Sequence, residues 1–153
     1  MNLKHTIMTT LVFGAIAAAG LNAASPGGKT VVISAFDTMK YSVNTIDAHP
    51  GEKITVELKN EGTLPKEAMG HNWVLLKAGS DPQAYANAAV AAKAEGFQPK
   101  SLADKVIASI KVLGPKETGT VSFTAPTAPG SYPYLCSFPA HCQVGMKGVL
   151  VVK

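Results

Sequence analysis

The chain has 153 residues and a formal net charge of +4 at pH 7, from 14 basic and 10 acidic residues. The basic residues are all lysines, and they are interleaved with Asp and Glu instead of forming the basic stripe that binds nucleic acid. Nucleic acid is therefore excluded as an expected partner, and the length suits one domain with a hydrophobic core.

Residues 1–24 have the layout of a secretory signal peptide. A short polar start precedes a mainly apolar run at residues 7–21, and small residues follow it. The run is shorter than the roughly 20 residues that span a bilayer, which disfavours the alternative of an uncleaved anchor. We expect cleavage after Ala23 or Ala24 and export to the periplasm. The mature protein, residues 25–153, would then have no membrane anchor.

The rest of the chain is dominated by short segments with the alternation of apolar and polar residues that is typical of β-strands. The clearest is Lys53–Lys59, with Ile54, Val56 and Leu58 on one face. About eight such strands, separated by turn residues, predict a single antiparallel β-sandwich or barrel. The expected strands are Thr30–Phe36, Ser42–Asp47, Lys53–Lys59, Asn72–Lys77, Lys105–Val112, Gly119–Thr124, Ser131–Leu135 and Lys147–Lys153.

One helix is expected to interrupt the strands, between Asp81 and Lys93. Asp81 and Pro82 are typical of an N-cap followed by the first helical residue, and the alanine-rich segment after them has high helix propensity. Gly96 ends the helical pattern. We expect the helix to pack on the outside of the strands, without a functional role, through a face formed by Tyr85, Ala88, Ala89 and Ala92.

Three side chains with metal-binding chemistry lie between the last two predicted strands. Cys136, His141 and Met146 are spaced five residues apart along one loop. A trigonal plane of two histidines and one cysteine, with a weak axial methionine, is the arrangement of blue-copper electron-transfer sites. The loop therefore supplies three of the four ligands, and a second histidine must come from elsewhere in the chain.

His49 and His71 are the candidates for the remaining ligand. His49 precedes a proline in a turn, where an exposed polar residue is the usual finding. His71 lies where a polar loop meets a predicted buried strand, and Gly70 before it allows close approach of the backbone. His71 is therefore preferred. A disulfide between Cys136 and Cys142 would consume the thiolate, so we expect Cys142 to be a free thiol that points away from the metal.

Three motifs together resemble the azurin and auracyanin branch of the cupredoxins: residues 69–75, 136–141 and 145–148. Shorter matches at residues 39–41, 64–66, 106–108 and 113–114 extend the resemblance over nearly the whole mature chain. The resemblance implies a Greek-key β-sandwich with a helical flap and one mononuclear copper ion per chain. It implies His71, Cys136 and His141 as equatorial ligands and Met146 as the axial one. The Gly70 carbonyl would make a weak contact with the metal on the side opposite Met146.

The chain departs from the azurin pattern in two respects. Azurins have a disulfide between early strands, and this region contains no cysteine here. Azurins also have three residues between the second histidine and the methionine, whereas His141 and Met146 are separated by four, as in auracyanin and plastocyanin. The ligand spacing therefore resembles the auracyanin type.

The resemblance also predicts residues around the ligands. Asn72 is placed to hydrogen-bond toward the Cys136–Ser137 segment, and backbone amides after Cys136 would tune the charge on its sulfur. An apolar patch at the metal end would dock redox partners beside the edge of His141, in small and short-lived contacts. The residues of this patch are Met39, Leu64, Ala68, Met69, Phe138, Pro139 and Ala140.

Electron transfer, copper buffering and a role as an enzyme module are the three functions open to such a protein. An enzyme module would need further copper ligands and a second domain, and a copper buffer would favour exposed Met- or His-rich tracts; the sequence has neither. We therefore expect a monomeric periplasmic carrier, not an enzyme, that shuttles single electrons through a blue copper site. Its expected donors and acceptors are cytochromes or copper and haem enzymes. A copper-buffering role is the alternative.

Overall fold

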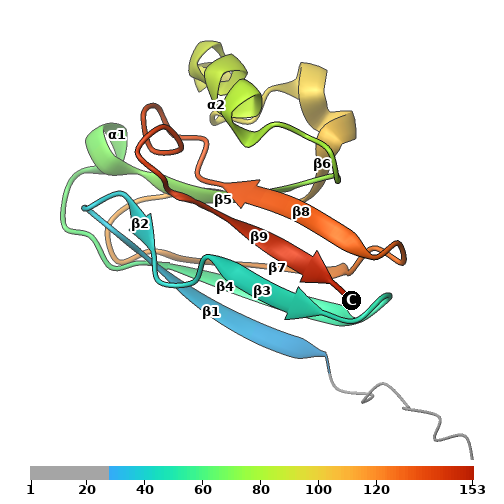
Figure 1. The fold of residues 1–153 in the computed structure, drawn as a ribbon. Coiled ribbons are helices and arrows are strands. Elements are labelled where there is room, and N and C mark those ends of the chain that lie inside the picture. Colours follow the sequence, from blue (N-terminus) through green and yellow to red (C-terminus); the bar gives the residue numbers. More distant parts are fainter. Residues whose placement is uncertain (1–27) are drawn as a thin grey trace, which may run out of the picture.

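Residues 28–153 are described by a computed structural model, and they form two β-sheets packed face to face (Figure 1). The predicted signal peptide lies outside the described residues. The four-stranded sheet has the order β2 (Lys40–Tyr41), β1 (Lys29–Phe36), β4 (Lys53–Asn60) and β7 (Thr118–Thr124). The five-stranded sheet has the order β3 (Thr45–Ala48), β9 (Lys147–Val152), β8 (Gly130–Leu135), β5 (His71–Leu76) and β6 (Val106–Leu113). The expected all-β Greek-key sandwich is confirmed, but the expectation of purely antiparallel strands was wrong. β1 pairs with β4, and β3 with β9, in parallel.

The core lies between the two sheets and follows the predicted alternation. In β4, Ile54, Val56 and Leu58 are all buried, while the residues between them are only half-buried. β5 is buried along its whole length because it is covered on both faces. Trp73 and Leu75 contribute to the core between the sheets, whereas Val74 and Leu76 pack on the opposite side.

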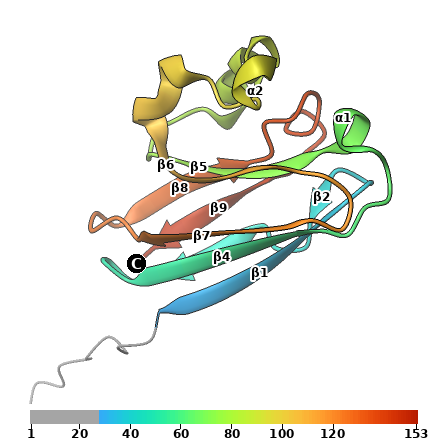
Figure 2. The ribbon, with the colours of Figure 1, turned by 180° about the vertical axis from the view of Figure 1, so that it is seen from behind.

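A helical insertion covers that opposite side of the five-stranded sheet (Figures 1 and 2). It consists of α2 (Pro82–Ala91) and two 3-10 helices, η1 (Lys93–Glu95) and η2 (Lys100–Lys105). Asp81 caps α2 as predicted, because its carboxylate accepts a hydrogen bond of 2.8 Å from the Gln83 N–H.

The predicted buried face of α2 was wrong at one position. The helix buries Tyr85, Ala86 and Ala89, whereas Ala88 is exposed and Ala92 is half-buried at the C-cap. Five of the ten residues of α2 are alanines on different sides of the helix, so the sequence pattern marks no single apolar stripe. The choice of face is made by the neighbouring Val74 and Leu76.

Two local features were not predicted. The segment Ser42–Asp47 is not one strand: β2 ends at Tyr41, and the chain crosses to the other sheet before β3 begins at Thr45. The crossing is held to β1 by hydrogen bonds between Ser42 and Ser34 of 2.9 and 2.8 Å. A short helix, α1 (Lys66–Met69), precedes β5. Among residues 28–153, none of the helices is long and apolar enough to cross a membrane.

Candidate metal centre

The metal-binding side chains meet at one end of the five-stranded sheet. β5 begins at His71, and its antiparallel neighbour β8 ends one residue before Cys136. The start of β5 therefore lies beside the loop that joins β8 to β9. In both views this loop runs between α1 and the helical insertion (Figures 1 and 2).

Three donor atoms converge there. One nitrogen of His71, one of His141 and the sulfur of Cys136 all lie within 4.8 Å of one another. The two Nδ1 atoms are 3.2 Å apart, and Cys136 Sγ is 3.4 Å from His141 Nδ1. All three residues are almost fully buried. A thiolate with two imidazoles in a buried cluster suits copper by the chemistry of its donors.

Met146 is brought to the same end by the hydrogen bonds of its loop. The Met146 N–H donates to the carbonyl of His141 at 2.9 Å, and the Met146 carbonyl accepts from the Cys136 N–H at 3.0 Å. Gly145 allows this return because it has a φ of +95°, which L side chains rarely adopt. Met146 is fully buried and belongs to the same apolar cluster as Cys136.

Burial sets the protonation of the donor groups. It raises the pKa of the Cys136 thiol to about 12, although the backbone N–H groups of Asn72 and Phe138 favour the thiolate. Burial also lowers the pKa of His141 to about 4, helped by the charge of His71, and lowers the pKa of His71. At neutral pH both imidazoles are therefore neutral, and a metal ion needs to displace one proton, from the thiol.

Asn72 and Ser137 join the two segments that carry the donors. The Asn72 amide donates to Ser137 Oγ at 2.8 Å, and its carbonyl oxygen accepts from the Ser137 N–H, also at 2.8 Å. Both residues are fully buried. Ser137 Oγ in turn donates to the carbonyl of Phe97 at 2.6 Å. Sequence reasoning missed Phe97, because a backbone carbonyl acceptor leaves no signal in the sequence.

Gly70 is buried at a point where a side chain would not fit. A Cβ atom there would lie 2.5 Å from Val112 Cγ1 and 2.7 Å from the Lys66 carbonyl oxygen. Its backbone is extended, with φ −69° and ψ 148°, so the conformation itself does not require glycine. The local packing accounts for this glycine.

The predicted apolar patch is only partly exposed. Leu64, Ala68 and Ala140 are exposed, and Met39, Met69 and Pro139 are half-buried. Phe138 is buried instead, with its ring 4.9 Å from that of His141. Val144 is 46% exposed on the metal loop. Sequence reasoning missed it, although its place between His141 and Met146 is a usable signal.

The other candidate residues lie apart from the donor cluster. Cys142 is a free, buried thiol whose side chain packs beneath the helical insertion. His49 is exposed, and its Nδ1 lies 3.2 Å from the carbonyl oxygen of Lys153. Lys153 follows β9, at the opposite end of that strand from the metal loop.

A β-sandwich that gathers a thiolate, two imidazoles and a thioether at one end has the architecture of the blue-copper proteins. The sequence profile described as copper binding proteins, plastocyanin/azurin family, matches residues 29–153. The chain belongs to this family. The azurin of Pseudomonas fluorescens biotype C is 36% identical over 126 residues, which cover 80% of this chain and 97% of that azurin. Azurin-1 of Alcaligenes xylosoxydans xylosoxydans is 40% identical over 124 residues, covering 79% and 95%.

Solved structures of auracyanins show the same fold. The reduced auracyanin of Roseiflexus castenholzii has a TM-score of 0.73 and 37% identity, and the match covers 83% of this chain and 99% of that one. Auracyanin A of Chloroflexus aurantiacus, described as a blue copper protein, has a TM-score of 0.71 and 30% identity, with 83% and 100% covered. The chain is thus a blue copper electron-transfer protein of the azurin and auracyanin branch, with one copper ion per chain.

Proposed function

We propose that His71, Cys136 and His141 would hold the copper ion and that Met146 would add a weaker thioether ligand. The observation that carries this proposal is the convergence of Cys136 Sγ with the two imidazoles inside the protein. The Gly70 carbonyl is proposed as a further weak contact that the ion would have, because Gly70 immediately precedes the ligand strand.

When bound, the copper ion supplies a one-electron couple between Cu(I) and Cu(II), which prefer different geometries. The task of the protein is to hold one donor arrangement for both states. Burial of the donors excludes water, and the Asn72–Ser137 hydrogen bonds fix the two ligand segments relative to each other. The backbone N–H groups that point at Cys136 stabilise negative charge on its sulfur and so help to set the reduction potential.

The proposed cellular role is that of an exported periplasmic carrier, not an enzyme, that exchanges single electrons with redox proteins such as cytochromes. The signal-like residues 1–24 support export, with residues 25–153 as the mature domain. The exposed members of the apolar patch, Leu64, Ala68 and Ala140, together with Val144, support a small docking face near His141. We propose that the mature protein is a monomer, as suits brief encounters.

Stopped-flow oxidation of the Cu(I) protein by a c-type cytochrome tests this role. We expect rapid electron transfer, slowed in a Leu64→Lys variant because a charge would be buried at the docking face. Val32→Lys is the matched control. Val32 is 46% exposed, against 44% for Leu64, but it lies on β1 of the four-stranded sheet, away from the metal loop. Slow transfer by the wild type, combined with ready loss of copper to a chelator, would instead indicate a buffer.

Fractionation of cells expressing the full chain and N-terminal sequencing test export and cleavage after Ala23 or Ala24.

A further inference from the structure

The residue after His141 is anchored in the helical insertion, defined as residues 81–105. Cys142 is fully buried, in a cluster with residues of β5, β8 and α2. Its Sγ lies 3.7 Å from the carbonyl oxygen of Pro82, within hydrogen-bond range for sulfur. The neighbouring Gln143 donates to Asn87 Oδ1 at 3.2 Å on the exposed side. The metal loop is therefore attached to the first half of the insertion.

The residue after Cys136 is anchored in the second half of the insertion. Ser137 Oγ donates to the carbonyl of Phe97 at 2.6 Å, and the rings of Phe97 and Phe138 meet edge to face, with centroids 5.0 Å apart. Phe97 has a φ of +59°, a sparsely populated conformation for a bulky residue. Such a conformation persists only where the surrounding contacts hold it.

The two anchor residues, Ser137 and Cys142, occupy the same position relative to a ligand. Each of the two equatorial ligands on the loop is followed directly by a residue that the insertion holds: Ser137 after Cys136 and Cys142 after His141. The His141 side chain lies in the donor cluster, whereas that of Cys142 lies beneath the insertion. Fixing Cys142 therefore limits how far the backbone of His141 moves.

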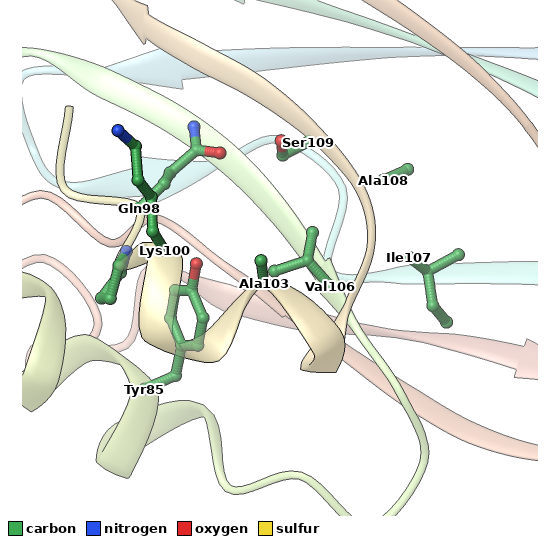
Figure 3. Close-up of a pocket in the computed structure, with 9 residues that line it drawn as sticks. Tyr85, Gln98, Lys100, Ala103, Val106, Ile107, Ala108 and Ser109 are labelled. Carbon is green, nitrogen blue, oxygen red and sulfur yellow. The ribbon is translucent and has the colours of Figure 1, made fainter. Parts of the chain in front are cut away.

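The insertion also borders β6. Residues of the insertion and of β6 line an open pocket of about 410 Å³ (Figure 3). Tyr85 lines the pocket from α2, and Val106 lines it from β6. In the described part of the chain, the buried Tyr85 hydroxyl has no hydrogen-bond partner. On this side Gln98 donates to the carbonyl of Ile110 in β6 at 3.3 Å, so the insertion has a polar contact with the sheet as well as with the copper loop.

We infer that the helical insertion is a positioning element of the copper centre and that Cys142 is one of its two anchors. This inference rests on the proposed ligand set. Holding the loop from outside keeps Cys136 and His141 in place whether or not metal is bound, so the donor geometry does not depend on the metal alone. This role differs from the passive covering expected of a surface helix.

The test replaces Cys142 by alanine in the copper-loaded protein. The variant loses the sulfur contact with Pro82 and the packing beneath α2, while all proposed ligands remain. We expect copper to leave for a chelator about tenfold faster than from the wild type, and the EPR hyperfine splitting of Cu(II) to change. Val90→Ala is the matched control, because Val90 lies on the exposed face of α2. It should leave both readouts unchanged.

Unfolding midpoints of the metal-free and copper-loaded forms separate positioning from simple stability. A positioning role predicts a larger loss in the copper-loaded form, because metal affinity falls as well. Wild-type EPR and release rate in Cys142→Ala, with equal losses in both forms, would overturn the inference. Should this variant fail to fold, Cys142→Val, which fills the space beneath α2 but has no donor for Pro82, is measured against the same criteria. A wild-type protein without an intense blue band would instead refute the proposed ligand set.

Discussion

Replacing Asn72 by alanine is expected to weaken the connection between the two ligand segments. The Asn72 side chain makes two hydrogen bonds of 2.8 Å to Ser137, both in the fully buried interior. Each such bond contributes about 1 kcal/mol, and leaving the buried Ser137 N–H without an acceptor adds about 1 kcal/mol or more. The free energy of unfolding of the metal-free protein should therefore fall by about 3 kcal/mol. For a domain of this size, that corresponds to a drop of about 10 °C in the unfolding midpoint.

Thermal and urea unfolding, followed by circular dichroism, measure this loss. Asn87→Ala is the matched control, because Asn87 lies on α2 and its hydrogen bonds to Gln83 and Gln143 are exposed. It should change stability by less than about 0.5 kcal/mol. If Asn72→Ala loses no more stability than Asn87→Ala, the assignment of Asn72 as the link between the ligand segments is refuted.

Three further predictions concern the metal and its surroundings. Burial raises the pKa of the Cys136 thiol to about 12, while the imidazoles of the site are neutral at pH 7. Binding of Cu(II) should therefore release one proton. The apparent affinity for Cu(II) should rise about tenfold for each pH unit above neutrality. Potentiometric titration checks this, and release of no proton or of two would contradict it. Gly70→Ala should destabilise the fold by about 2 kcal/mol in urea unfolding, because its Cβ would meet Val112 Cγ1 at 2.5 Å; wild-type stability would contradict the packing argument. Cys136→Ser should abolish the intense visible band of the copper protein, whereas Cys142→Ser should retain it; the reverse result in absorption spectra would exchange the roles of the two cysteines.

The strands and the donor residues were accessible from sequence for physical reasons. Strict alternation in β4 and the continuous apolar run of β5 reflect burial on one face and on two faces, respectively. Few side chains offer sulfur or imidazole donors, so Cys136, His141 and Met146 on one loop strongly indicate a metal site. The structure brings Cys136 and His141 together with His71 from a distant strand.

The features that sequence reasoning missed depend on tertiary contacts. The crossing between β2 and β3 is held by hydrogen bonds to β1, which no local pattern encodes. The anchoring of the copper loop uses the backbone carbonyls of Pro82 and Phe97, and every residue has such a group. The sequence therefore indicated a helical insertion but not that it contacts the copper loop.

Titration of the purified mature protein with Cu(II), followed by visible absorption and EPR, tests the proposed ligand set most directly. We predict an intense blue band with narrow hyperfine splitting that saturates at one copper per chain and is bleached reversibly by ascorbate. A protein that binds copper without this band, or that loses its free thiols while copper stays unbound, would contradict thiolate ligation by Cys136. The electron-carrier assignment would then fall.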